Sequence, residues 1–259
     1  MGYKSQGLKT LLMTSAMYTG TTFLRELLQM LPFLGMPLQT NHILDDKLSP
    51  FFWKDYLGVV RSDPQISLNG IEQYFQELSR ANNGVVFVNG HVHEGWMHSI
   101  LFFLPFPHKV IASIRHPFDA LISKYLRGTV VPEDLNSGWM WSYLEVLRLK
   151  LNRPKDVVLI PVDLLGQKTE EERVTIISSL LGSLGISVAE KDKGCQEFFA
   201  RVRSWEPLNA HKGEKSVSPG LYQEVIDRLD KSNVYYYLQR AGLNYRYKPY
   251  QSEFKSLDN

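Results

Sequence analysis

The sequence predicts an α/β fold in which a central parallel β-sheet is flanked by helices. Short apolar runs of strand length alternate along the chain with stretches of helical hydrophobic spacing. These runs lack polar alternation, as expected for parallel strands buried on both faces. Of the 259 residues, 44% are hydrophobic and 22% charged, an ordinary globular composition that excludes disordered, collagen-like and coiled-coil chains. We find no repeat, low-complexity tract or linker, and therefore expect residues 1–259 to form a single domain.

The elements follow from local patterns. The first strand is expected within Leu8–Ser15, followed by a turn and by a helix over Thr21–Met30. Proline, glycine and aromatic residues are frequent from Pro32 to Asn69, which favours irregular segments and short helices rather than a sheet. The later elements are expected in the order strand Val85–Val88, strand Lys109–Ile114, helix Ser137–Asn152, strand Val157–Val162, helix Thr169–Leu184 capped by Gly185, and helix Leu221–Gly242 after a break at Pro207–Gly220. Trp139 and Tyr143, at helical spacing, are expected to pack on the sheet.

The charge balance limits the classes of partner. The chain has 29 Lys and Arg residues and 27 Asp and Glu residues, which gives a net charge of +2. This excess of positive charge is too small for a protein that binds nucleic acid or anionic membranes. Cys195 is the single cysteine, which excludes an internal disulfide and a cysteine-rich zinc site, and we expect no metal. Met1–Lys9 lacks the features of a signal peptide, and the most apolar stretch, Ile100–Phe106, is too short to span a bilayer. We therefore expect a cytoplasmic protein with no membrane partner, and leave its oligomeric state open.

The first motif is the loop Ser15–Thr22, which lies between the first strand and the first helix. Its glycine lets the backbone approach an anion, free N–H groups at the helix start point at that anion, and threonine hydroxyls add donors. The candidate binding residues are Tyr18, Thr19, Gly20, Thr21 and Thr22. The arrangement is P-loop-like, but Thr21 stands where a nucleotide kinase carries lysine. A capped turn with no ligand is the alternative, because threonine is a common N-cap.

The second motif follows the Lys109–Ile114 strand. Arg115 is expected at the carboxyl end of that strand and Ser123 about two turns into the next helix, so that both can reach one phosphate. The alternative is that Arg115 pairs with Asp119 and that Ser123 is an ordinary helix residue.

Together, the strand followed by Gly-Thr-Thr and the later Arg-His-Pro-x-Asp-Ala-x-x-Ser-Lys-Tyr resemble the sulfotransferases that use 3′-phosphoadenosine 5′-phosphosulfate. The resemblance implies that Thr19–Thr22 hold the 5′-phosphosulfate and that Arg115 and Ser123 hold the 3′-phosphate. It also implies 3′-phosphate contacts from His211, Lys212 and Gly213, which resemble the Arg-Lys-Gly segment of the family, and adenine contacts from Ser204 and Trp205. By themselves, His211–Gly213 also fit a solvated basic loop.

The resemblance implies a catalytic base near the end of the Val85–Val88 strand. His91 is the first candidate and His93 the second, since imidazole titrates near neutral pH. Two family lysines are replaced, by Tyr18 and Asn89, which bring no charge to the leaving phosphate. We expect transfer of a sulfuryl group from 3′-phosphoadenosine 5′-phosphosulfate to a hydroxyl or amine of a small molecule such as a natural product. The alternatives are a P-loop phosphotransferase and a nucleotide-binding protein without turnover.

Overall fold

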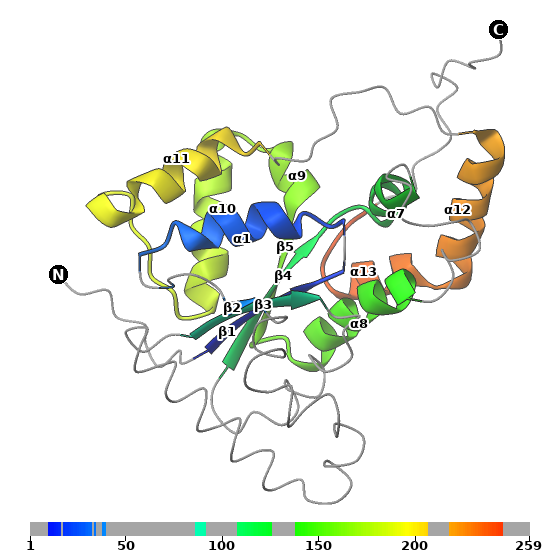
Figure 1. Cartoon of the computed structure of the whole chain (residues 1–259), viewed down its shortest axis with the longest axis horizontal. Helices are drawn as coiled ribbons and strands as arrows, with labels where there is room; N and C mark the ends of the chain where they lie inside the picture. Colours follow the sequence, from blue (N-terminus) through cyan, green and yellow to red (C-terminus); the bar gives the residue numbers. More distant parts are fainter. Residues whose placement is uncertain are drawn as a thin grey trace, which may run out of the picture.

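Five parallel strands form the central sheet, in the order β2-β3-β1-β4-β5 (Figure 1). The structure is a computed structural model of the chain, and it describes residues 10–16, 18–32, 34, 38–39, 86–91, 108–125, 138–206 and 218–245. The strands are β1 (Thr10–Ser15), β2 (Leu38–Gln39), β3 (Val86–His91), β4 (His108–Ile114) and β5 (Val157–Pro161).

Four of these strands coincide with predicted ones. β2 does not, because Pro32–Asn69 was expected to hold no strand, and a two-residue strand is too short to show a period. β3 extends three residues beyond the predicted Val88, because Asn89, Gly90 and His91 pair with the last three residues of β1. Val162 was expected to end β5 but begins the following helix instead.

The helices are α1 (Thr21–Gln29), α7 (Pro117–Tyr125), α8 (Gly138–Asn152), α9 (Val162–Gly166), α10 (Glu170–Ser183), α11 (Gln196–Ser204), α12 (Pro219–Lys231) and α13 (Val234–Arg240), with a 3₁₀ turn at Lys193–Cys195. α10 begins with a capping box between Thr169 and Glu172, and Gly185 follows its end with φ 80°, as predicted for a cap. Over the described ranges, no helix is long and apolar enough to cross a membrane.

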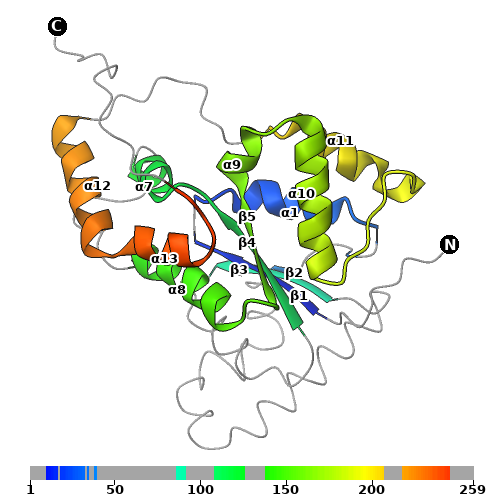
Figure 2. The same ribbon diagram turned by 180° about the vertical axis from the view of Figure 1, so that it is seen from behind.

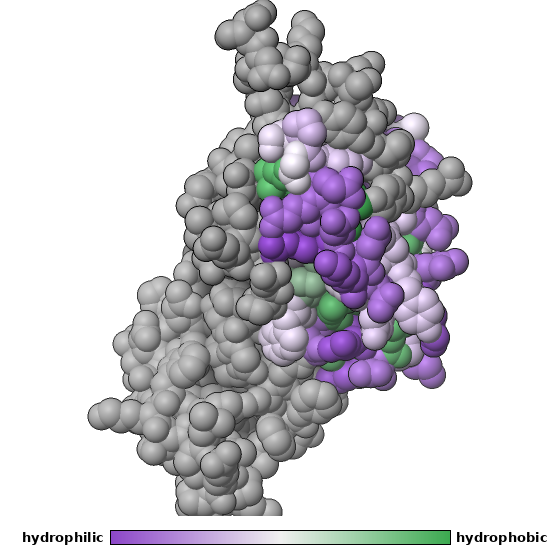
Figure 3. All heavy atoms as spheres, turned by 90° about the vertical axis from the view of Figure 1, so that its right-hand side faces the viewer, coloured by the Kyte–Doolittle hydropathy of each residue, from purple (hydrophilic) through white to green (hydrophobic). Residues whose placement is uncertain are grey.

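The C-terminal part differs from the prediction of one helix over Leu221–Gly242. α12 starts at Pro219, because proline is tolerated in the first turn and Ser218 accepts a hydrogen bond from the N–H of Leu221. The chain breaks again at Asn233, whose φ of 56° is left-handed, and α13 follows. On the side of the molecule where α12 lies, hydrophilic side chains predominate among the described residues (Figure 3).

Two helical layers cover the sheet (Figures 1 and 2). α1, α10 and α11 pack on one face, and α7, α8, α12 and α13 pack on the other. Each face of the sheet therefore has its own hydrophobic core: the first core lies under α1, α10 and α11, and the second lies under α7, α8, α12 and α13. Side chains alternate between the faces along β1, so that Leu11 and Met13 belong to the first core and Leu12 belongs to the second. The predicted burial of Trp139 and Tyr143 is confirmed, since both belong to the second core.

The strand order places a switch point between β1 and β4. The chain leaving β1 crosses toward β2 on one side, whereas the chain leaving β4 crosses toward β5 on the other. Open parallel sheets bind ligands in the crevice outside the carboxyl ends of two such strands, where the connections diverge. The β1–α1 loop and the turn between β4 and α7 meet at this point.

Candidate functional site

Three buried hydroxyl side chains join the two loops at the switch point. The Ser15 Oγ at the end of β1 accepts hydrogen bonds from the backbone N–H of Ser113 at 2.8 Å and from the Ser113 hydroxyl at 3.0 Å. The Thr19 Oγ1 shares a hydrogen bond of 3.1 Å with the Ser113 Oγ and donates to the carbonyl oxygen of Ala16 at 2.7 Å. Since the Thr19 side chain is fully buried in these contacts, its hydroxyl shapes the loop.

This network brings two predicted site residues to one edge of the sheet. Gly20 directly follows Thr19, and Arg115 lies two residues beyond Ser113. Consecutive Cα atoms are about 3.8 Å apart, so the Thr19–Ser113 contact keeps both residues in one neighbourhood. Gly20 and Arg115 therefore flank the carboxyl ends of β1 and β4, as the sequence predicted.

Position 20 requires glycine both for its backbone conformation and because a side chain there would clash with Val162. Its φ is 95°, in the left-handed region, and an added Cβ would lie 2.9 Å from the Cγ2 of Val162. Val162 begins α9, immediately after β5. The β1–α1 loop therefore lies directly against the end of β5, and no larger residue fits at its tip.

Gly20→Ala is accordingly expected to destabilise the protein by about 1–3 kcal/mol, the scale of one strained backbone position, and to shift the loop. Chemical denaturation measures the first effect. Gly182→Ala is the matched control, because nothing lies within 4 Å of an added Cβ at this α10 position, and alanine is the better helix former. Equal stability of Gly20→Ala and the unmodified protein would contradict the close approach.

The start of α1 presents unused donors. No side chain caps this helix, and its first hydrogen bond inside the helix is that from the N–H of Leu24 to the carbonyl of Gly20. Among the residues that the structure describes, the buried Thr21 Oγ1 has no hydrogen-bond partner. A buried unpartnered hydroxyl beside helix-start N–H groups that no side-chain cap engages fits an anion that would complete the set. Thr22 follows Thr21 in the first turn and is half-buried.

The turn after β4 carries Arg115, which is half-buried, and α7 carries Ser123, which is 3% exposed. The hydroxyl of Tyr143 in α8 donates to the Arg115 carbonyl oxygen at 2.6 Å. The Asp163 Oδ2 in α9 accepts a hydrogen bond from the backbone N–H of His116 at 2.8 Å. The backbone beside Arg115 is therefore tied to two other helices.

His91 is the last residue of β3 and pairs in register with Ser15, the last residue of β1. The strand register therefore places His91 beside the start of the β1–α1 loop. Asn89 pairs with Met13, two positions back along both strands. His93 lies outside the described residues, as do His211, Lys212 and Gly213, and the roles of these four residues stay predictions.

Tyr18 and Trp205 have packing contacts that the sequence did not predict. Tyr18 has a φ of 65° and packs in part against the α7/α8 core. Trp205 ends α11 with a φ of 31°, is 4% exposed, and donates from its indole N–H to the Val162 carbonyl at 2.8 Å. Its ring meets that of Phe23 edge-on at 4.8 Å. Trp205 thus fixes α11 against α1 beside the loop, and adenine contacts by Ser204 and Trp205 stay predictions.

Sequence reasoning gave no role in this site to Ser113, Tyr143, Asp163 or Tyr245. The hydroxyl of Tyr245 donates to the Asp163 Oδ1. Burial first, and the Asp163 carboxylate second, raise the pKa values of Tyr143 and Tyr245 well above the usual value for tyrosine, so both phenols remain donors at neutral pH. The available signal was a polar residue close to the end of an apolar strand: Ser113 is the second-last residue of β4, and Asp163 follows the end of β5 by two residues.

Comparisons with known proteins bear on the fold. No family model matches the sequence. No curated protein matches it either. Among solved structures, it resembles the sulfotransferase domain of the olefin synthase from Synechococcus PCC 7002, with a TM-score of 0.53 and 16% identity, over 89% of this chain and 98% of that one. This likeness confirms the predicted fold class, an α/β fold with a P-loop-like parallel sheet flanked by helices.

Proposed function

We propose that the protein is a sulfotransferase that moves a sulfuryl group from 3′-phosphoadenosine 5′-phosphosulfate to a hydroxyl or amine of a small molecule. The observation that carries the proposal is the hydrogen-bonded junction of Thr19 with Ser113, which joins the loop that carries Gly20 to the turn that carries Arg115 at the switch point. The fold shared with a sulfotransferase domain supports it. We assign the reaction to the cytoplasm, with no nucleic-acid or membrane partner, on the composition described above.

The residues present fit a nucleotide that carries phosphate groups at both ends of its ribose. Gly20 allows close backbone approach, and Thr21 offers its unpartnered hydroxyl to the 5′ end. The guanidinium of Arg115 would bind the 3′-phosphate as a fork, with Ser123 as a further donor. A 3′-phosphate distinguishes this donor from AMP and ATP, so the arginine turn determines which nucleotide is preferred.

His91 would act as the general base, because the strand register places it beside the loop. It would take the proton of the acceptor hydroxyl as the oxygen forms its bond to sulfur. In the same step the bond between sulfur and the 5′-phosphate oxygen breaks, and the bonding electrons remain on adenosine 3′,5′-bisphosphate. The helix-start N–H groups of α1 would stabilise the charge that develops on this leaving phosphate.

Two other functions use parts of the same site. A phosphotransferase of the kinase type needs a lysine where Thr21 stands. A nucleotide-binding protein without turnover would explain why Tyr18 and Asn89 replace the lysines of the family. The preferred nucleotide distinguishes the phosphotransferase from the proposed function, and the presence of turnover distinguishes the binding protein from it.

Thermal unfolding with three ligands tests the proposal. Adenosine 3′,5′-bisphosphate is expected to raise the melting temperature more than AMP or ATP with magnesium at equal concentration, because a ligand that binds only the folded state stabilises it. A preference for ATP would refute sulfuryl transfer. Preference for the bisphosphate without transfer of labelled sulfate to any acceptor would leave a binding protein.

Thr21→Val tests the loop at the level of one oxygen atom. The free protein is expected to keep its stability or gain up to about 1 kcal/mol, because the lost hydroxyl has no partner. Affinity for the bisphosphate should fall about 10- to 150-fold, the range of a hydrogen bond to a charged group, because the phosphate acceptor is ionised. Thr14→Val is the matched control, since Thr14 Oγ1 is likewise buried and unpartnered but lies within β1. Unchanged affinity in both variants, measured by calorimetry, would remove Thr21 from the site.

A further inference from the structure

The peptide group between Arg115 and His116 is hydrogen-bonded at both ends. Its carbonyl oxygen accepts from the Tyr143 hydroxyl at 2.6 Å, and its N–H donates to the Asp163 Oδ2 at 2.8 Å. The two partners lie in α8 and α9, which are 28 and 47 residues away along the chain. One peptide plane is thus held by side chains from two separate helices.

The Asp163 carboxylate is itself held in place. Its Oδ1 accepts from the Tyr245 hydroxyl and from the backbone N–H of Leu164, the latter at 3.0 Å. The ring of His116 meets the ring of Tyr245 edge-on at 5.4 Å, and the His116 Nδ1 accepts from the N–H of Phe118 at 3.3 Å. The carboxylate therefore has little freedom to turn away from the His116 N–H.

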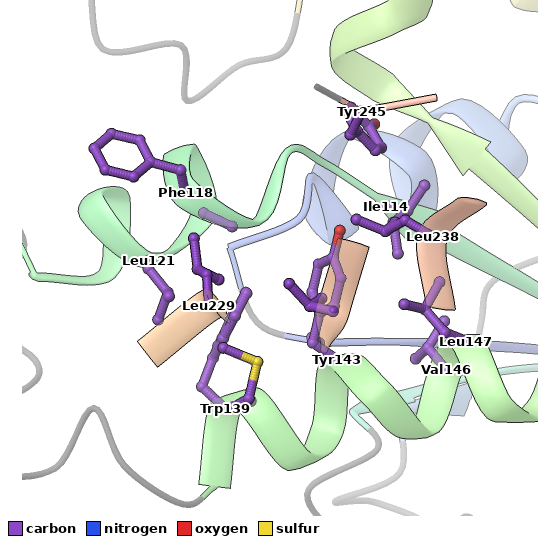
Figure 4. Packing of buried hydrophobic residues seen from close by; sticks show 14 of the residues in the cluster. Ile114, Phe118, Leu121, Trp139, Tyr143, Val146, Leu147, Leu229, Leu238 and Tyr245 are labelled. Carbon is purple, nitrogen blue, oxygen red and sulfur yellow. The ribbon is translucent and has the colours of Figure 1, made fainter. Parts of the chain in front are cut away.

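These partners are buried. Tyr143 is fully buried, and Tyr245 is 9% exposed. Figure 4 shows the Tyr143 hydroxyl directed from α8 toward the turn that links β4 to α7, with Tyr245 on the far side of that turn. In such surroundings hydrogen bonds are strong and a lost partner is not replaced by water. The backbone conformation on the carboxyl side of Arg115 is thereby fixed.

We infer that Tyr143, Asp163 and Tyr245 form a positioning cluster for Arg115, which holds its main chain so that the guanidinium meets the 3′-phosphate; this inference rests on the proposed function. Binding a phosphate as a fork depends on direction as well as charge, and a backbone fixed beforehand lowers the ordering cost of binding. The cluster therefore governs selection of the 3′-phosphorylated nucleotide. Its three residues contact the arginine turn: Tyr143 and Asp163 through hydrogen bonds, and Tyr245 through the ring of His116.

Tyr143→Phe and Tyr245→Phe test this inference, since each removes a single oxygen. The readout is the ratio of the dissociation constants for AMP and adenosine 3′,5′-bisphosphate, measured on the full chain. Tyr143→Phe is expected to lower bisphosphate affinity about tenfold, near the upper end of the range for a hydrogen bond between neutral groups, and to leave AMP affinity unchanged. Tyr245→Phe should shift the ratio in the same direction by less, because it acts through Asp163.

Two controls separate positioning from general stability. Val146→Ala removes a fully packed side chain from α8, close to Tyr143, and is expected to lower the melting temperature without changing the ratio. In the Arg115→Ala background, Tyr143→Phe should change the ratio no further, because the two residues act through one contact.

The outcomes are distinct. If the unmodified protein shows no preference for the bisphosphate, the proposed function fails and the inference with it. If it shows the preference and Tyr143→Phe keeps the full ratio, or weakens both ligands equally, the positioning cluster is refuted and the proposed function stands. If Tyr143→Phe does not fold, the same criteria apply to Tyr245→Phe.

Discussion

Replacing His91 by alanine is expected to slow sulfuryl transfer by about 10²- to 10⁴-fold, the usual contribution of a general base, and to leave binding of adenosine 3′,5′-bisphosphate unchanged. The reason is position: the register of β3 with β1 sets His91 opposite Ser15, where the β1–α1 loop begins. A group that only takes the acceptor's proton adds nothing to the affinity for the nucleotide product. Rate and affinity should therefore separate in this variant.

The measurement is single-turnover transfer from donor labelled in its sulfate, to an acceptor first identified by screening with the same donor. His93→Ala is the control, because it removes a second imidazole only two positions along the chain. Full activity in His91→Ala together with its loss in His93→Ala would move the base to His93. Full activity in both would remove His91 and His93 from this step.

Arg115→Ala is expected to weaken binding of adenosine 3′,5′-bisphosphate by about 1.5–3 kcal/mol, or roughly 10- to 150-fold, the range of hydrogen bonds to charged groups. AMP, which lacks the 3′-phosphate, should lose far less. Arg115→Lys should recover only part of the affinity, because an ammonium group keeps the charge and lacks the planar fork.

Lys109→Ala controls for the loss of one positive charge. Lys109 lies near the opposite end of the same strand, β4, and its Nζ pairs with the Asp156 Oδ1 at 2.6 Å. Titration calorimetry at two salt concentrations compares the variants. Equal losses in Lys109→Ala and Arg115→Ala would reduce the effect to overall charge and would place Arg115 outside the binding site.

The sheet was predictable because its buried strands are nearly continuous apolar runs. Leu11–Met13 and Val110–Ala112 are buried on both faces of the sheet. These strands could therefore be recognised without an alternating hydrophobic pattern and without knowing how they pair. The loop between β1 and α1 was also predictable, since a glycine between a strand and a helix is a local signal. β2 and the break at Asn233 were not, because two residues carry no period and asparagine adopts the left-handed region only in some contexts.

The support of the candidate site could not be predicted from the sequence. Tyr143 had the spacing of a core aromatic, and nothing local indicates that its hydroxyl meets the Arg115 carbonyl 28 residues away. Trp205 is predicted to contact adenine, and nothing local indicates that its indole N–H is bonded to the Val162 carbonyl 43 residues earlier in the chain. Such contacts depend on where the helices pack, and local propensity does not determine tertiary packing.

Val162 and Asp163 are neighbours in the chain, and each contacts a loop proposed to bind a different end of the nucleotide. The Val162 side chain lies against Gly20, below the 5′ loop, and the Asp163 carboxylate holds the backbone beside Arg115, at the 3′ end. A tilt or shift of the short α9 helix would move the contact at Gly20 and the hydrogen bond beside Arg115 together. Substitutions at the β5–α9 junction are therefore expected to change the spacing between the sites for the two phosphate groups, because Val162 and Asp163 contact one loop each.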